Sequence, residues 1–289
     1  MRMLMHADNC TLLVVDVQEK LIASIIEAPR LVAAMKWLVD AARLNGVPVV
    51  VSEQYPQGLG RTLPILTDAL VEPCVVEKTT FSCVAANCLK GTPAELRNQV
   101  VICGIEAHVC VLQTALDLKA AGKEVFMVAD AVGSRSQEDK VVALARAAAA
   151  GIHVITREMA LFEWMRDSRA PQFRDASKQL LQVIPGLKFP EVLACLPRID
   201  HLAGMQLWRE GKLESIIENR PGQTGSLAVY NALYRDFGAI TPKAARLGQW
   251  LYSEHAEDAR KHPGKHPNID RLFSLEVVGG GYGVRLMMH

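Results

Sequence analysis

The stretch NQVVICGIEAHVCVLQTALDLKAAGKEVFMVAD, residues 98–130, decides the fold of the first part of this chain. Residues 98–104 and 123–130 are short β-branched runs typical of strands, and residues 108–122 have the apolar spacing of a helix that ends on Gly122. A strand, a helix and a second strand in this order predict two parallel strands joined by a crossover helix.

The same alternation runs through about the first 160 residues. The other strand-like runs are residues 11–17, 47–53, 73–78 and 151–156. The other helical patterns are residues 30–46 and 137–151. The strand-like runs are almost wholly apolar, as is typical of parallel strands buried on both faces. The sequence therefore predicts an α/β fold, a Rossmann-like doubly wound parallel sheet with helices on both faces.

The sequence pattern changes near residue 183, where three prolines interrupt the alternation of strand-like and helical runs. Two strand-like runs then flank Gly211 as a hairpin. They are followed by helical patterns and a closing strand at residues 224–238, 241–261, 268–277 and 282–288. These patterns predict a small α+β domain at 188–289, after a first domain at 1–182.

The overall composition excludes several classes of partner. The 289 residues include 32 basic and 31 acidic side chains, a net charge of +1 that predicts no nucleic-acid partner. No stretch approaches the ~18 apolar residues of a membrane span, so no membrane association is expected. Seven cysteines without a CxxC pair, and no signal-peptide pattern, predict reduced thiols in the cytoplasm.

Reactive residues stand where the predicted strands end, and ligands of open parallel sheets bind beyond the carboxyl ends of the strands. Asp16 ends the first strand, Lys78 ends the third, and Cys110 opens the helix after the fourth. A thiol at a helix N-terminus beside an ammonium group is expected to have a lowered pKa. With Asp16 as proton acceptor and helix-opening N–H groups for an oxyanion, acyl transfer becomes possible.

Position alone leaves an alternative open, because buried free cysteines are usually small core residues and Cys110 fits that description too. Cys83 and Cys88 follow the third strand and could lie near the site, but their spacing is a weak metal signal. Ser136 is expected to cap the helix that follows it.

Five phrases together resemble a known family: LLVVDVQEKL, VVVSEQYPQGLG, VVEKTTFS, VVICGIEAHVCVLQTALDL and VADAVGSRSQEDKVVALAR. They are similar to the isochorismatase-like, or cysteine-hydrolase, superfamily, and most similar to its subgroup of isochorismatase domain-containing protein 2. The resemblance covers roughly residues 8–180. It implies the Rossmann-like fold, an Asp-Lys-Cys triad of Asp16, Lys78 and Cys110, and a homo-oligomer, for which the alanine-rich helix at 137–150 could be a contact.

The resemblance also implies a cis peptide bond between Ile105 and Glu106, and an oxyanion hole made by the backbone amides of Glu106 and Cys110. Nicotinamidases of the superfamily carry an Asp-x-His metal motif, whereas the matching stretch here, SEQYPQGLG, has no histidine and one carboxylate, Glu53. We therefore predict no catalytic metal and no cofactor. Because siderophore-type isochorismate hydrolases commonly lack this cysteine, its retention favours an amide or another carbonyl substrate.

Side chains beside the triad in sequence are candidates for substrate binding, although ordinary loop packing explains them equally well. They are Gln18, Glu53, Gln54, Tyr55, Phe81 and His108.

The predicted function is a metal-independent cysteine hydrolase that acts on a small amide or related carbonyl compound through a thioester. The alternative is a non-catalytic ligand-binding or scaffold protein, in which the pocket is a sensor and the second domain offers a partner surface. Residues 195–289 resemble a small bacterial domain family of unknown function, which implies no chemistry. Near-neutral charge and the missing metal carboxylates speak against a nuclease.

Overall fold

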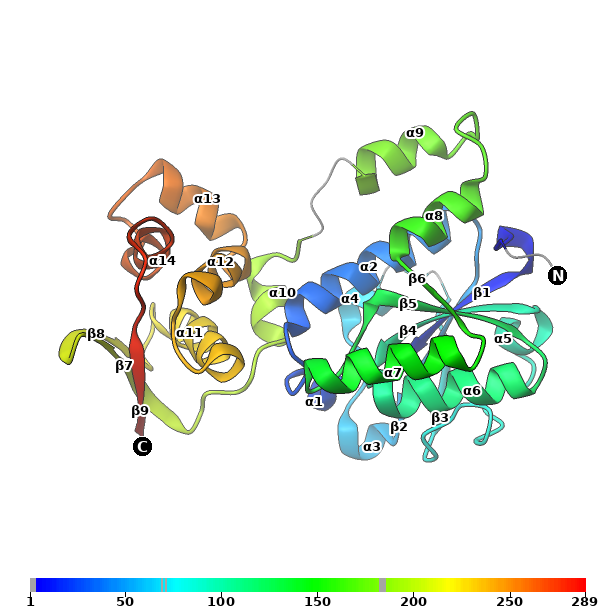
Figure 1. Ribbon diagram of the computed structural model, residues 1–289, viewed down its shortest axis with the longest axis horizontal. Helices are drawn as coiled ribbons and strands as arrows, with labels where there is room; N and C mark the ends of the chain where they lie inside the picture. The colour runs from blue at the N-terminus through cyan, green and yellow to red at the C-terminus, as the bar shows by residue number, and fades with distance from the viewer. Residues whose placement is uncertain (1–3, 69, 71, 182–185) are drawn as a thin grey trace. The chain divides into compact units, whose positions relative to one another are not determined.

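The computed structural model describes residues 4–68, 70, 72–181 and 186–289 (Figure 1). The chain divides into two compact units, Met1–Pro185 and Gly186–His289. In the first unit, six parallel strands form one sheet in the order β3-β2-β1-β4-β5-β6. The strands are β1 (Cys10–Val15), β2 (Val49–Gln54), β3 (Cys74–Lys78), β4 (Gln99–Ile105), β5 (Glu124–Gly133) and β6 (His153–Ile155). This arrangement confirms the predicted fold class.

Long helices cover both faces of this sheet (Figure 1). Helices α2 (Ala28–Leu44) and α8 (Arg157–Met165) pack together on one face, and α6 (Leu112–Ala120) and α7 (Gln137–Ala149) pack on the other. Ser136 caps α7 as predicted, because its Oγ accepts the Asp139 N–H at 3.1 Å. The shorter helical segments are η1 (Ala7–Asn9), α1 (Glu19–Ile22), α3 (Pro56–Leu59), α4 (Pro64–Thr67), α5 (Pro93–Leu96), η2 (Ala107–Val111), α9 (Phe173–Ala176) and η3 (Ser177–Leu181).

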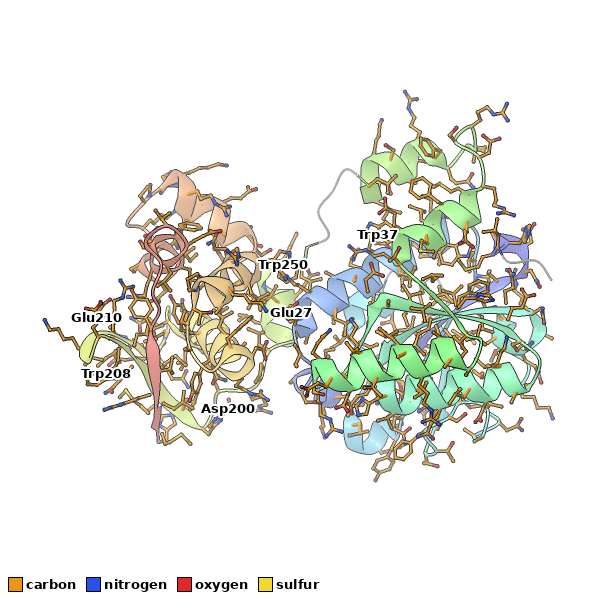
Figure 2. The ribbon with its side chains drawn as sticks, in the orientation of Figure 1. Glu27, Trp37, Asp200, Trp208, Glu210 and Trp250 are labelled. Carbon is orange, nitrogen blue, oxygen red and sulfur yellow. The ribbon has the colours of Figure 1, made fainter. Side chains whose placement is uncertain are left out.

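The core of the first unit lies on both sides of β1 and β4. Every residue of these two strands is buried, which explains why their sequences are almost wholly apolar. Each fully buried Leu, Val or Ile contributes about 1.5–3 kcal/mol relative to an exposed one. On α2, the buried side chain of Trp37 donates from Nε1 to Leu180 O at 3.0 Å, and the guanidinium group of Arg157 lies over its ring (Figure 2).

The second unit has a three-stranded antiparallel sheet in the order β8-β7-β9. Its elements are α10 (Phe189–Ala194), β7 (Leu202–Arg209), β8 (Lys212–Glu218), α11 (Thr224–Phe237), α12 (Pro242–Leu251), α13 (Glu254–Lys261), α14 (Pro267–Val278) and β9 (Gly283–Met288). On β7, Trp208 stacks with Arg285 of β9, whose guanidinium carbon lies 4.5 Å from the ring centroid (Figure 2). A small α+β architecture is therefore present after the parallel sheet.

Two sequence-based expectations about these elements were wrong. The pattern at 241–261 is two helices instead of one, because Ser253 between α12 and α13 has a φ of 50° and interrupts the helical path. Strand β5 continues to Gly133 instead of ending at Asp130, after a register shift between Ile102 and Gly104 of the neighbouring strand. Asp130 therefore lies within a strand.

In the described part of the chain, no helix is both long enough and apolar enough to cross a membrane.

Gly104 is required by the close approach of β4 to β1. Its φ is 123°, and a Cβ atom there would lie 2.2 Å from Val15 O. We expect Gly104→Ala to lower the free energy of unfolding by about 3 kcal/mol or more, since both the clash and the backbone conformation are unfavourable. Thermal unfolding followed by circular dichroism measures this change.

The matched control is Gly283→Ala on β9, where the nearest atom to a new Cβ is Trp208 O at 3.8 Å. A midpoint for Gly104→Ala equal to that of this control would contradict the close approach.

Candidate active site

The candidate site lies at the carboxyl edge of the parallel sheet, beside β1 and β4. These strands are neighbours, and the strand order runs outward from them in opposite directions. In doubly wound sheets such a switch point leaves a crevice in which ligands bind. Asp16 directly follows β1, Cys110 lies in η2 just after β4, and Lys78 is the last residue of β3.

A buried ion pair forms the centre of the site. Lys78 Nζ lies 2.6 Å from Asp16 Oδ2, and the two side chains are 0% and 1% exposed. Ser52 Oγ donates a hydrogen bond to Asp16 Oδ1 at 2.7 Å, so both carboxylate oxygens have a donor. The backbone of Asp16 has a φ of 53°, a left-handed conformation that Asp tolerates better than most residues. The chain therefore turns out of the sheet directly after β1.

Cys110 lies beside this ion pair, in the helical turn that follows β4. Its thiol lies near enough to the Asp16 carboxyl group for that group to act on the thiol pKa, and the residue is 7% exposed. It belongs to η2, a π-helical turn in which Val111 N donates to Glu106 O at 3.2 Å. The Ile105–Glu106 peptide bond that precedes the turn is cis. The structure thus brings all three residues of the predicted triad together.

The acid–base state of the thiol differs from the sequence-based expectation. Burial, followed by the negative charge of Asp16, raises the pKa of Cys110 to about 12, and the opposing effect of Lys78 is smaller. The expectation of a lowered pKa was wrong because it counted the ammonium group and the helix but not desolvation. Burial also raises the pKa of Asp16, and Lys78 and Ser52 offset part of that rise. A raised carboxyl pKa makes Asp16 a stronger proton acceptor.

Gln18 holds a loop beside the site. Its Nε2 atom donates to Gln54 O at 3.0 Å and to Gly60 O at 2.7 Å, and its Oε1 atom accepts the Gln54 N–H at 2.8 Å. These three bonds use both N–H groups and the carbonyl oxygen of the amide. Gln18 therefore fixes the loop after β2, and its role as a substrate contact stays a prediction.

The carboxylate of Glu53 also has its hydrogen-bond partners within the protein. It accepts the Thr62 N–H at 2.7 Å and a hydrogen bond from Arg61 at 2.8 Å. Burial raises the pKa of Glu53, but these donors outweigh it and hold the pKa below its usual value. Among the described residues, no three His, Cys, Asp or Glu side chains are grouped so that they could hold a metal ion.

The other predicted substrate-binding residues differ in exposure. Gln54 reaches the ion pair, because its Oε1 atom accepts from Lys78 Nζ at 2.6 Å. Tyr55 and Phe81 are each 53% exposed. His108 is partly buried, with Nδ1 3.0 Å from the hydroxyl oxygen of Ser134. Gln54 therefore contacts Lys78, a member of the predicted triad.

Sequence reasoning missed Ser52, which the structure places against Asp16. Ser52 is fully buried in β2, within the otherwise apolar run VVVS. A polar side chain in a strand buried on both faces needs a hydrogen-bond partner, and that requirement was the available signal. Ser52 therefore holds the Asp16 carboxylate in position.

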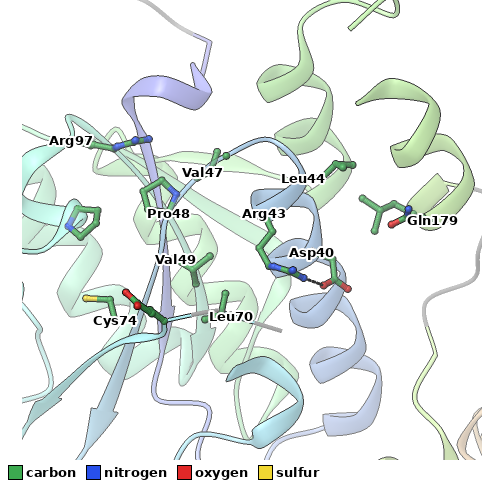
Figure 3. A pocket seen from close by; sticks show the side chains of 14 residues that line it. Asp40, Arg43, Leu44, Val47, Pro48, Val49, Leu70, Cys74, Arg97 and Gln179 are labelled. Atoms are coloured by element: carbon green, nitrogen blue, oxygen red, sulfur yellow. Dashed lines mark ion pairs between the residues drawn. The ribbon is translucent and has the colours of Figure 1, made fainter. Parts of the chain in front are cut away.

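A cleft of about 840 Å³ lies at the opposite, amino-terminal edge of the sheet (Figure 3). The starts of β2 and β3 line it with Val49 and Cys74, and α2 contributes Asp40 and Arg43, whose charged atoms are 3.6 Å apart. Its lining contains no member of the triad. The cleft is therefore separate from the reactive residues at the carboxyl edge.

The comparison with known families decides the identity of the first unit. The isochorismatase domain model matches residues 10–159, just over half of the chain. The chain belongs to the isochorismatase family. This membership confirms the resemblance seen in the five sequence phrases. Residues 189–285 match a second model, described as an uncharacterized protein conserved in bacteria (DUF2322).

Relatives within the isochorismatase family match the same part of the chain. Isochorismatase domain-containing protein 2A of Mus musculus is 39% identical over 178 residues, which are 62% of this chain and 85% of the mouse protein. The human isochorismatase domain-containing protein 2 is 39% identical over 177 residues, 61% of this chain and 85% of the human protein. A solved structure, the MAR1 ribonuclease from Caenorhabditis elegans, is 37% identical with a TM-score of 0.58 and covers 63% of this chain and 94% of its own.

The raised pKa of Cys110 gives a direct test of the site's electrostatics. We expect iodoacetamide to label Cys110 slowly at pH 8.5 and faster as the pH rises toward about 12. Asp16→Asn should label faster than the unmodified protein at pH 8.5, because removal of the neighbouring negative charge lowers the thiol pKa. Tandem mass spectrometry of the tryptic peptide 98–119 measures the labelled fraction.

Asp130→Asn is the matched control, since it removes a carboxylate of the same sheet that is not among the causes of the Cys110 pKa shift. Fully buried Cys103 in the same peptide serves as an internal standard that should stay unlabelled. Fast labelling at pH 7 that slows in Asp16→Asn would contradict the raised pKa.

Proposed function

We propose that this member of the isochorismatase family is a hydrolase that uses Cys110 as a nucleophile on a small amide or related carbonyl substrate, without a metal or another cofactor. The single observation that carries the proposal is the convergence of Cys110 on the buried ion pair of Lys78 and Asp16 at the carboxyl edge of the sheet. A nucleophile beside a base that a third group orients is the general arrangement for covalent catalysis.

The first half of the proposed reaction forms a thioester. Asp16 takes the thiol proton as Cys110 Sγ attacks the carbonyl carbon of the substrate, so the thiol is ionised only during attack. This order suits a resting thiol whose pKa is about 12. The C–N bond then breaks, and Asp16 returns the proton to the departing amine. In the second half, water attacks the thioester, Asp16 takes its proton, and the acid product leaves as the thiol is restored.

Two further groups support the charges that develop. We assign the oxyanion hole to the backbone amides of Glu106 and Cys110, on the resemblance to the family. Lys78 stabilises the carboxylate form of Asp16 through the 2.6 Å contact. Removal of one oxyanion donor typically costs about 10²–10³ in turnover, so these amides would be a large part of the rate acceleration.

The proposed substrate is small because the nucleophile is nearly buried, at 7% exposure. We propose Gln54, which touches Lys78, together with Tyr55, Phe81 and His108, as the groups that meet the rest of the substrate. We further propose residues 1–182 as the hydrolase domain, residues 188–289 as a separate small domain, a cytoplasmic location and a homo-oligomer. The exposed Val141 and Val142 on α7 support the helix at 137–150 as a subunit contact.

A second candidate is RNA cleavage, favoured by the name of the C. elegans ribonuclease that is 37% identical to this chain. The net charge of +1 offers little attraction for a polyanion such as RNA. A thioester forms at a carbonyl carbon, and the phosphodiester bond that a ribonuclease cleaves has none. A third candidate is a ligand-binding protein without turnover, which the presence of the second unit supports.

Cys110→Ala and Asp16→Asn should each lower turnover of the best substrate by about 10³-fold or more, because the two residues act as one unit. The measurement is release of amine or acid from a panel of small amides, ureas and esters, with a structured RNA as an additional substrate. Circular dichroism checks that each variant is folded.

Asp130→Asn is the control carboxylate and should keep full activity. Turnover of RNA that survives Cys110→Ala would favour the ribonuclease. Ligand binding without any Cys110-dependent turnover would favour the non-catalytic protein. Either result, with no Cys110-dependent turnover of an amide or ester, would reject the proposed cysteine hydrolase.

A further inference from the structure

Two cysteines that the proposed reaction does not use lie beside the site. Cys83 is fully buried, and Cys88 is partly buried in the same turn between β3 and α5. Neither is a member of the triad, and the five-residue spacing between them is a weak metal signal.

The backbone holds these two residues in a defined arrangement. Cys88 N donates to Cys83 O at 3.2 Å, and Asn87 N donates to Val84 O at 2.9 Å. Asn87 has a φ of 53°, in the left-handed region. These two hydrogen bonds, with left-handed Asn87 as the donor of one of them, form the Schellman motif, in which the first and last side chains are often in contact. Both of those side chains are cysteines here.

The side chains complete the arrangement. The Cys88 thiol donates to Cys83 O at 3.3 Å, and its sulfur lies near enough to the Cys83 thiol to affect the pKa of that thiol. Cys83 N donates to Thr114 Oγ1 at 3.1 Å, which ties the turn to α6. Hydrogen bonding from Cys88 holds the pKa of Cys83 below its usual value, whereas the pKa of Cys88 is raised. A thiol of lowered pKa with a second thiol beside it is the usual composition of a redox-sensitive pair.

Cys83 also lies beside Ser52, the residue that holds the Asp16 carboxylate in position. The Cys83 thiol lies close to the Ser52 hydroxyl, which donates its proton to Asp16 and helps to lower the pKa of Cys83. Ser52 therefore links Cys83 to the carboxylate, and a change at the Cys83 sulfur would alter how Ser52 holds Asp16.

We propose that Cys83 and Cys88 form a modification site that a small hydroperoxide converts reversibly into a disulfide. The Cys83 thiolate attacks one peroxide oxygen, so that an S–O bond forms, the O–O bond breaks and an alcohol or water leaves. The Cys88 sulfur then attacks Cys83, so that an S–S bond forms and the S–O bond breaks with loss of water. The two thiols lose two electrons and the peroxide gains them.

Formation of the disulfide draws the Cys83 sulfur toward Cys88 and removes the thiol that lies beside Ser52, so it should lower turnover by about fivefold, the effect of one hydrogen bond. This consequence rests on the proposed hydrolase function, whereas formation of the disulfide does not.

Tryptic cleavage after Lys78 and Lys90 isolates both cysteines in the peptide TTFSCVAANCLK, residues 79–90, without another cysteine. After exposure of the folded full-length protein to hydrogen peroxide and blocking of remaining thiols, we expect this peptide to lose two hydrogens and to regain them with dithiothreitol. Cys83→Ser and Cys88→Ser should each abolish the change, and Cys74→Ser, on β3, should keep it.

A cross-link between peptides 79–90 and 98–119, or oxidation of Cys110 while peptide 79–90 stays reduced, would overturn the proposal. If peptide 79–90 closes but turnover of a working substrate is unchanged, the link to Ser52 is wrong. If no substrate is ever turned over, the proposed function fails, and the peptide mass still decides this inference.

Discussion

The buried contact between Lys78 and Asp16 constrains the whole candidate site. Two opposite charges with almost no solvent exposure are stable only if each also has hydrogen-bond partners, because desolvation of ions is expensive. Ser52 supplies a partner to the carboxylate, and Gln54 supplies one to the ammonium group. The positions of β2 and β3 relative to β1 are therefore fixed by the chemistry at their ends as well as by their backbone ladders.

Most of the sheet could be predicted from the sequence, because strands buried on both faces leave runs of apolar residues that few other structures produce. The positions of Asp16, Lys78 and Cys110 followed from the same pattern, since parallel strands end at one edge. The interruption at Ser253 could not be predicted, because serine has no strong preference for a left-handed backbone and the helical pattern continues across it.

The details of the site were less accessible for a different reason. The pKa of Cys110 depends on how much solvent the surrounding chain removes, and local sequence carries no measure of that quantity. The contacts of Gln18 and Glu53 depend on the path of the loop after β2, which passes close to Gln18, 42 residues from Gly60 in sequence, and folds back on Glu53. A polar residue near a reactive one is therefore as often a support for the backbone as a contact for a ligand.

The π-helical turn η2 has a consequence for how the thiol is aimed. It holds one residue more than an α-helical turn, and α6 continues from it with Leu112, Ala115 and Leu118 buried in the core. Loss of one residue here would restore α-helical spacing and rotate one side of the junction by about 100°. Either Cys110 would face Asp16 or the apolar stripe would face the core, but not both. The number of residues in this turn sets the helical phase that lets one segment serve reactivity and packing together.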